Sequence, residues 1–151
     1  MDNNITIEEL VSELPKAIIK QGNQFITIIT SPEEYKKTAH ILCKQFLFNY
    51  LVNMTGVDEM PQLAVVSHLR DLSTGQMIVL RTGTENREEP VIDSLCDLWP
   101  SAIYFEREIF DLLGIRFNNN PDMNRLFMDD DYPGFPLRKD FIDPFNTPSE
   151  R

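Results

Sequence analysis

The chain has 151 residues, which is enough for one ordinary domain and too few for two. Its hydrophobic content of 42% and charged content of 25% are typical of a globular protein rather than a disordered one. The formal net charge of −10 argues against nonspecific nucleic-acid binding and against a polybasic lipid-binding surface, because both need a basic footprint.

Membrane insertion and export are also disfavoured. No apolar run approaches the roughly 20 residues that a membrane-spanning helix needs, so we expect no direct membrane insertion. The N-terminal residues MDNNITIEEL lack the basic and apolar regions of a secretory signal. The two cysteines, Cys43 and Cys96, lie far apart among apolar neighbours, as in proteins of a reducing cytoplasm. These features favour a cytoplasmic location.

The first third of the chain predicts a helix, a strand and a second helix. Residues 6–19 begin with TIEE, a capping-box pattern that marks the start of a helix, and Pro15 is expected to end or kink it. QFITIIT (24–30) has the β-branched and aromatic composition of a strand. In 31–46 a serine, a proline and two glutamates precede apolar residues at helical spacing, which predicts another helix.

The middle of the chain predicts clustered strands and then helices. The second half of 46–56 is expected to be a strand. The β-rich runs 62–72 and 77–85 are joined by a short loop containing a glycine, which predicts a β-hairpin. Two helical segments are expected next, at 91–99 and 100–114. Segregated elements of this kind indicate an α+β fold with a mostly antiparallel sheet packed with helices.

The composition changes from Asn118 onward. Five of the ten prolines lie between Pro121 and Pro148, and no regular period is visible. We therefore expect an extended, irregular segment at 118–151 after an α+β core domain at 1–117. The segment carries too many apolar and aromatic side chains for a solvated tail. Because these side chains must be buried on the chain's own domain or on a partner, 118–151 is a candidate docking segment.

Charged side chains accompany an apolar stripe in the helix predicted at 100–114, whose end Gly114 is expected to cap. Arg107 and Asp111 are four residues apart and are expected to pair on the outer side, whereas Glu106 falls inside the stripe. One interpretation is a solvated charged face beside a core stripe. The other is that buried, paired charges fix tertiary or subunit geometry, with Glu106 bonded to an arginine or to backbone N–H groups.

The sequence offers no complete catalytic or metal-binding motif. Asp129, Asp130 and Asp131 are consecutive, whereas calcium loops place acids at alternating positions, so a metal site there is disfavoured. The histidines His40 and His68 are isolated, and no phosphate loop, dinucleotide fingerprint or Cys-x-x-Cys motif occurs. We expect no catalytic residue, metal or cofactor in this chain. A stand-alone metal-dependent enzyme that uses the three aspartates is the weaker alternative.

One continuous stretch resembles a known family. YFEREIFDLLGIRFNNNPDMNRLFMDDDYPGFPLRKDF (104–141) is similar to the signature of the 30 kDa subunit of respiratory complex I, the NADH:quinone oxidoreductase. That family carries Glu-Arg-Glu-x-aromatic-Asp-x-x-Gly, then His-Pro-Asp-x-Arg-Arg-Leu, then Asp-aromatic-x-Gly-x-Pro-Leu-Arg-Lys-Asp. Asn120 and Asn124 stand where the family has His and Arg, and Tyr132 stands where Trp is common. Asn120 can keep one hydrogen bond of a histidine but cannot be protonated.

The resemblance implies a non-catalytic subunit of the peripheral arm, on the cytoplasmic side of a bacterial membrane. It would brace the large quinone-site subunit and the subunit holding the terminal iron–sulfur cluster, with FMN, iron–sulfur clusters and quinone in partner subunits. A homologous scaffold subunit of a membrane-bound hydrogenase or a ferredoxin-linked quinone reductase is the alternative, because the electron donor binds elsewhere. The implied subunit-interface and structural residues are Glu106, Arg107, Glu108, Asp111, Gly114, Pro121, Asp122, Arg125, Tyr132, Gly134, Pro136, Leu137, Arg138, Lys139 and Asp140.

Overall fold

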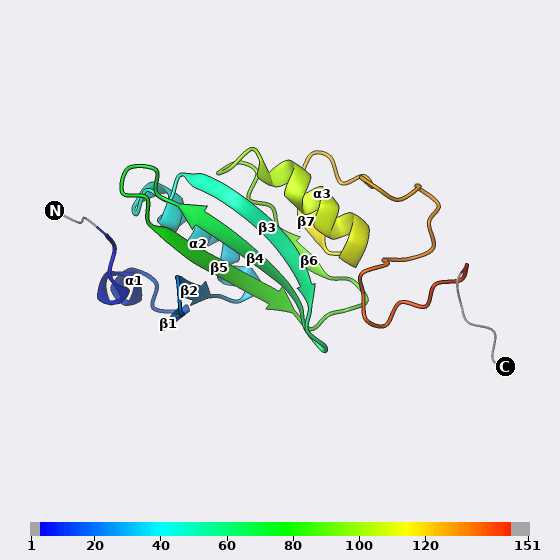
Figure 1. Cartoon of the computed structure of the whole chain (residues 1–151), viewed down its shortest axis with the longest axis horizontal. Helices are drawn as coiled ribbons and strands as arrows, with labels where there is room; N and C mark the ends of the chain where they lie inside the picture. Colours follow the sequence, from blue (N-terminus) through cyan, green and yellow to red (C-terminus); the bar gives the residue numbers. More distant parts are fainter. Residues whose placement is uncertain (1–3, 146–151) are drawn as a thin grey trace.

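The computed structural model describes residues 4–145, in which helices and strands combine as an α+β fold (Figure 1). The helices are α1 (Ile7–Glu13), α2 (Pro32–Lys44) and α3 (Ala102–Leu113). The strands are β1 (Ile18–Gln21), β2 (Ile26–Ile29), β3 (Tyr50–Asp58), β4 (Leu63–Arg70), β5 (Met77–Thr84), β6 (Val91–Asp93) and β7 (Arg116–Asn118).

A five-stranded sheet with the order β1-β2-β5-β4-β3 forms the centre of the molecule. β3, β4 and β5 pair antiparallel, as do β1 and β2, while β2 and β5 run parallel. The expected mostly antiparallel sheet is therefore confirmed, and β4 and β5 form the predicted hairpin. β6 and β7 form a separate, parallel pair.

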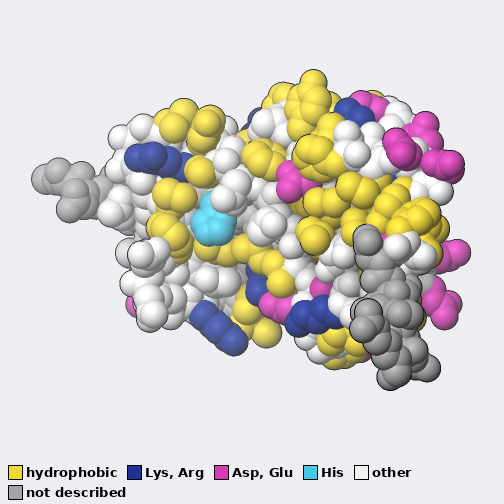
Figure 2. Space-filling view, turned by 45° about the vertical axis from the view of Figure 1, so that its right-hand side comes forward, with side chains coloured by type: hydrophobic (Ala, Val, Ile, Leu, Met, Phe, Trp, Pro, Cys, Tyr) yellow, Lys and Arg dark blue, Asp and Glu magenta, His cyan; other side chains and the backbone are white. Residues whose placement is uncertain are grey.

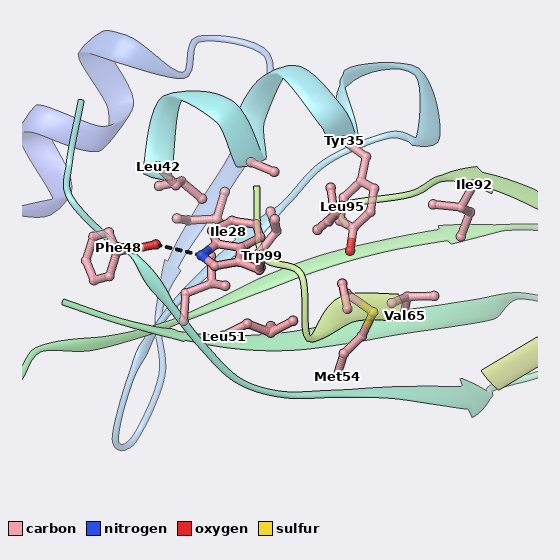
Figure 3. Close-up of a cluster of buried hydrophobic side chains, with 14 of the residues drawn as sticks. Ile28, Tyr35, Leu42, Phe48, Leu51, Met54, Val65, Ile92, Leu95 and Trp99 are labelled. Carbon is pink, nitrogen blue, oxygen red and sulfur yellow. Dashed lines mark hydrogen bonds between the residues drawn. The ribbon is translucent and has the colours of Figure 1, made fainter. Parts of the chain in front are cut away.

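The hydrophobic core lies between the sheet, α2 and the turn after β6 (Figure 3). Ile28 of β2, Leu42 of α2 and Val65 of β4 are fully buried. Trp99 joins this cluster from the turn, and its indole N–H donates to the carbonyl oxygen of Phe48 at 3.2 Å. The indole thus buries its apolar rings without leaving its donor unsatisfied.

Helix α3 lies against β3 at a position where only glycine leaves room. A Cβ atom on Gly56 of β3 would lie 2.4 Å from Leu113 Cδ1 and 2.9 Å from Ile109 Cγ2. The helix ends at Gly114, whose φ of +77° is the left-handed conformation that favours glycine. The expected cap is therefore confirmed, and the chain turns there directly into β7.

Several elements begin or end a few residues from where the sequence indicates. The helix expected over 6–19 ends at Glu13, two residues before Pro15, because proline has no N–H with which to continue the helix. The chain then extends into β1, which pairs with β2. Residues 26–29 form the predicted strand β2, and the strand expected in the second half of 46–56 continues to the end of β3.

The helix expected at 91–99 is wrong. Residues 91–93 form β6 in register with β7, and the following turn directs Leu95 and Trp99 into the core. Apolar residues at short spacing fit either a helix or a strand followed by a turn. The distant partner strand β7, which was not predicted, decided between them.

From Asn119 to Phe145 the described chain forms neither helix nor strand, as expected for an extended segment, and we call these residues the C-terminal segment. Figure 1 shows it leaving β7 near α3 and continuing along the side of the molecule opposite α1. Its backbone returns to the core, since the Leu137 N–H donates to the Leu112 carbonyl at 3.0 Å. The rest of the predicted docking segment, 146–151, lies outside the described residues.

Candidate functional site at helix α3 and the C-terminal segment

Glu106 of α3 is fully buried and makes its hydrogen bonds within the chain. Its carboxylate accepts from Ser94 Oγ at 2.7 Å and from the Leu95 backbone N–H at 2.8 Å. A third hydrogen bond comes from Asn120 Nδ2 at 2.8 Å, so the residue at the family's histidine position holds the C-terminal segment to α3. The backbone partner agrees with the interpretation of a buried, paired charge, and all three donors are neutral.

Burial raises the pKa of Glu106 above its ordinary value of 4.5, although its three hydrogen bonds favour the ionised form. At pH values between the unfolded and the folded pKa of Glu106, the folded state therefore binds more protons than the unfolded state. The free energy of unfolding should therefore fall as the pH rises above 4.5, until Glu106 is ionised in both states.

We expect Glu106→Gln to make the free energy of unfolding fall less steeply with rising pH than in the wild type, because the glutamine cannot titrate. Urea denaturation followed by circular dichroism, repeated between pH 4.5 and about 7, measures this slope. Glu108→Gln, on the exposed side of the same helix, is the matched control and should keep the wild-type slope. Equal slopes in all three proteins would contradict the assignment.

Arg107 joins α3 to the beginning of the C-terminal segment. Its guanidinium donates to the carbonyl oxygens of Asn124 at 3.2 Å and Arg125 at 3.0 Å. The same group lies 3.1 Å from Asp122 Oδ2, and Asn124 Nδ2 donates to Asp122 Oδ1. The expected pair between Arg107 and Asp111 is wrong, because each of these side chains binds the C-terminal segment instead.

Asp111 is fully buried rather than part of a solvated face. Its Oδ2 accepts the backbone N–H groups of Leu126, Phe127 and Met128 at 3.1, 2.6 and 3.1 Å. Its Oδ1 accepts a hydrogen bond from Arg125 Nη1 at 3.2 Å. Burial alone would raise the pKa of Asp111, but the N–H groups and the guanidinium lower it below its usual range. One carboxylate therefore fixes a whole turn of the C-terminal segment on α3.

Arg125 closes the next part of the segment into a loop. Its Nη2 donates to the carbonyl oxygens of Tyr132 at 3.0 Å and Gly134 at 2.9 Å. The guanidinium also lies 5.0 Å from the ring centroid of Phe135, within the range of a cation–π contact. Gly134 has a φ of +115°, which favours glycine at this turn. Residues 125–135 are thus held in one arrangement by the side chain that pairs with Asp111.

Residues 138–140 return the segment to the core domain. Arg138 donates to the last carbonyl of α3 at 2.6 Å and to the Arg87 carbonyl at 2.7 Å. The Lys139 backbone N–H donates to Asp58 Oδ2 at 2.9 Å, and Asp140 lies 3.1 Å from the Arg87 guanidinium. Arg87 also binds both oxygens of Asp58 at 2.9 and 2.8 Å. The guanidinium groups of Arg87 and Arg138 therefore have partners within the chain, and the role of 138–140 at a subunit interface stays a prediction.

Apolar side chains of the same segment face outward, and Figure 2 shows apolar surface gathered on the side of the molecule that carries it. The large exposed ones are Leu126, Phe127, Leu137, Ile142 and Phe145. Their exposed fractions run from 38% to 76%, although the backbone that carries most of them is fixed. Of the remaining predicted residues, Glu108 and Pro121 are exposed and Pro136 is half-buried. The arrangement presents apolar surface in a set geometry, which suits an interaction site.

The three consecutive aspartates 129–131 are exposed. Among residues 4–145, no three side chains of His, Cys, Asp or Glu come close enough together to hold a metal ion. Nor does this part of the chain contain a helix that is both long and apolar enough to cross a bilayer.

Four residues that build the site were missed in the sequence: Ser94, Leu95, Asp58 and Arg87. The separation along the chain from the group that each binds runs from 11 residues, for Leu95 and Glu106, to 81 residues, for Asp58 and the Lys139 N–H. Two of the hydrogen-bonding groups are backbone atoms, which have no residue signature. Only the covariation of Asp58 and Arg87 in an alignment could have indicated that pair from sequence.

Comparisons with known proteins agree with the sequence signature. Residues 28–146 match the family model described as "Respiratory-chain NADH dehydrogenase, 30 Kd subunit". The C subunit of the NADH-quinone oxidoreductase of Roseiflexus sp. (strain RS-1) is 36% identical over 148 residues, which cover 93% of this chain and 84% of that protein. The fused C/D subunit of the NADH-quinone oxidoreductase of Phocaeicola vulgatus is 46% identical over 99 residues, which cover 65% of this chain but only 19% of that protein.

A solved structure supports the fold independently. A chain of the membrane-bound sulfane sulfur reductase, an archaeal respiratory membrane complex, superposes with a TM-score of 0.77. The match covers 92% of this chain and 85% of that one, and at 20% identity it shows a shared fold. Because the family model matches most of its length, this chain belongs to the family of the 30 kDa subunit of the respiratory-chain NADH dehydrogenase.

Proposed function

We propose that this chain is a non-catalytic subunit of the peripheral arm of a proton-translocating NADH:quinone oxidoreductase, where its C-terminal segment covers part of a neighbouring subunit. The observation that carries the proposal is the contrast within that segment. Arg107, Asp111 and Arg125 fix its backbone on α3, while large apolar side chains remain exposed. A fixed segment loses less conformational entropy on binding than a flexible tail, which favours docking.

The neighbours in this proposal are the large quinone-site subunit and the subunit that holds the terminal iron–sulfur cluster. FMN, iron–sulfur clusters and quinone would then be bound by partner subunits, and this chain would transmit no electrons itself. It would be held on the cytoplasmic side of the membrane by other subunits. The names of the curated relatives support NADH as the donor. A hydrogenase or a ferredoxin-linked reductase would differ in the subunits that bind the donor.

The exposed side chains of Phe127 and Ile142 allow a direct test. We expect Phe127→Ser combined with Ile142→Ser to lower the recovery of partner subunits about tenfold or more, because each apolar side chain buried at an interface contributes roughly 1.5–3 kcal/mol. The measurement is the amount of each partner that co-purifies with the affinity-tagged chain from its native membranes. The midpoint of thermal unfolding of the isolated chain should stay unchanged, because neither side chain is buried in it.

The matched control replaces two side chains of comparable exposure away from the C-terminal segment, Val11→Ser on α1 and Leu72→Ser after β4, which are 53% and 61% exposed. This variant should co-purify its partners at the wild-type level. Equal recovery from the test variant and the wild type would rule out docking through the segment. The purified assembly also tests the donor, since hydrogen or ferredoxin oxidation without NADH oxidation would select the alternative complexes.

A further inference from the structure

The parallel pair β6–β7 has one buried face and one exposed face. Ile92 and Phe117 point into the core and are 1% and 2% exposed. Val91 and Arg116, which are paired in register, both point outward, and Val91 is 38% exposed. Parallel strands are normally covered on both faces. Figure 1 shows the pair beside α3, within the part of the molecule that also carries the C-terminal segment.

Two hollows lie on either side of Val91 on this outward face. The first, of about 260 Å³, lies between Pro90, Arg116 and Phe135. The second, of about 280 Å³, lies between Pro32 at the start of α2 and Asn118. Val91 lines both hollows, and we call the two hollows together the Val91 groove.

The rim of the Val91 groove is acidic. Glu88 and Glu89 line the first hollow, and Glu33 and Asp93 line the second. Within residues 4–145, none of these four carboxylates forms an ion pair. The cation of the groove is Arg116, whose guanidinium lies 4.9 Å from the ring centroid of Phe110. The groove therefore has an apolar floor and an excess of negative charge that the described part of the chain does not neutralise.

The walls of the groove are held in place from behind. Arg87, next to the two glutamates, is bound to the buried carboxylate of Asp58. The ring of Phe135 contacts the guanidinium groups of Arg125 and Arg138, whose Cζ atoms are 5.0 and 5.1 Å from the ring centroid. A groove with fixed walls needs little rearrangement before it binds a ligand, which favours recognition.

We propose that the Val91 groove binds an extended, basic segment of a neighbouring subunit. Side chains of an extended chain alternate, so residues on either side of Val91 would enter the two hollows. One apolar side chain would occupy the hollow beside Phe135, and lysine or arginine side chains would face the four carboxylates. The proposal rests on the proposed function, that the chain is assembled with other subunits, and adds a surface separate from the exposed side chains of the C-terminal segment.

Site-specific photo-crosslinking within the native assembly tests the proposal. A benzophenone amino acid is placed at position 91, at position 142 in the C-terminal segment, or at position 11 on α1. The reagent at 91 should crosslink to a lysine- or arginine-rich stretch of another subunit, identified by mass spectrometry. Crosslinking at 142 but not at 91 would overturn this inference alone, whereas no crosslink at either site and no co-purified subunits would overturn the proposed function. A crosslink from 91 to a second copy of this chain or to its own residues 146–151 would also overturn the inference.

Charge reversal provides the second measurement. Glu88→Lys with Glu89→Lys should lower co-purification of the crosslinked partner about tenfold, and the difference from the wild type should shrink at high salt, because exposed charges are screened there. Glu8→Lys with Glu13→Lys, on exposed positions of α1, makes the same change in net charge and should leave recovery unchanged. The isolated groove variant should unfold at the wild-type temperature. If the groove variant recovered the partner subunit within about twofold of the wild-type amount, the proposal that a basic segment binds the groove would be contradicted.

Discussion

Replacing Asp111 with alanine is expected to lower the free energy of unfolding by about 3–5 kcal/mol, the range for breaking a buried ion pair from one side. The change removes the acceptor of three backbone N–H groups in 126–128. It also leaves the Arg125 guanidinium, whose side chain is 12% exposed, without its carboxylate. Unpaired buried donors keep their full desolvation cost, so the loss should exceed that of a neutral hydrogen bond.

Urea denaturation of the isolated chain at neutral pH, followed by circular dichroism, measures the loss. Glu108→Ala is the matched control, because Glu108 is an exposed acid on the same helix. It should change stability by less than about 0.5 kcal/mol. Limited proteolysis adds a local readout, since the Asp111 variant should be cut within 119–137 faster than the control. A loss below about 1 kcal/mol would mean that Asp111 is not the main attachment of the segment.

Asp58→Asn is expected to cost about 3 kcal/mol at neutral pH, somewhat less than the Asp111 change because asparagine keeps one acceptor oxygen. The Asp58 side chain is 2% exposed. Its carboxylate accepts hydrogen bonds from two guanidinium nitrogens of Arg87, from the Lys139 backbone N–H at 2.9 Å and from the Met60 backbone N–H at 3.1 Å. An asparagine amide would direct its own N–H groups at these donors. The variant should therefore weaken the attachment of Lys139 to the core, while the hydrogen bonds of Arg138 remain.

The pKa of Asp58 also predicts how the free energy of unfolding changes at low pH. The hydrogen bonds from Arg87 hold the pKa of Asp58 well below its ordinary value of 3.8, with the Lys139 and Met60 N–H groups acting in the same direction. A lowered pKa contributes stability that is fully present above pH 3.8 and is lost as the pH falls through the folded value. Wild-type stability should thus fall in acid, and Asp58→Asn should flatten this part of the profile.

Glu59→Gln is the control for both measurements, since Glu59 is the next residue and pairs with Arg81 with its side chain 38% exposed. An exposed pair contributes less than about 1 kcal/mol, so this variant should stay close to the wild type at neutral pH and in acid. If Asp58→Asn matched the control in both experiments, the link between the core and 138–140 would not contribute to stability.

Local sequence signals were sufficient for most of the regular structure. The capping box at Thr6 and Glu9 forms as predicted, and the hairpin of β4 and β5 follows from two β-rich runs around a short loop. Gly114 caps α3 because the left-handed turn there requires glycine. The sequence also placed the family signature at 104–141, which the family match confirms.

The tertiary structure decided what the charged residues of that signature bind. Spacing alone suggested that Arg107 pairs with Asp111, but both reach the C-terminal segment, whose backbone offers acceptors to the first and donors to the second. The position of β6 likewise depended on β7, which lies beyond α3 in the chain.

The sequence by itself therefore determined the family, the α+β class and the change of character after Asn118. Only the tertiary structure decided that the following segment is attached to its own domain through Asp111 and Asp58 while five of its large apolar side chains face outward. The physical reason is that helix caps and hairpins arise from neighbours along the chain. These attachments instead join a carboxylate to backbone N–H groups that are 15 to 81 residues away and carry no side-chain signature.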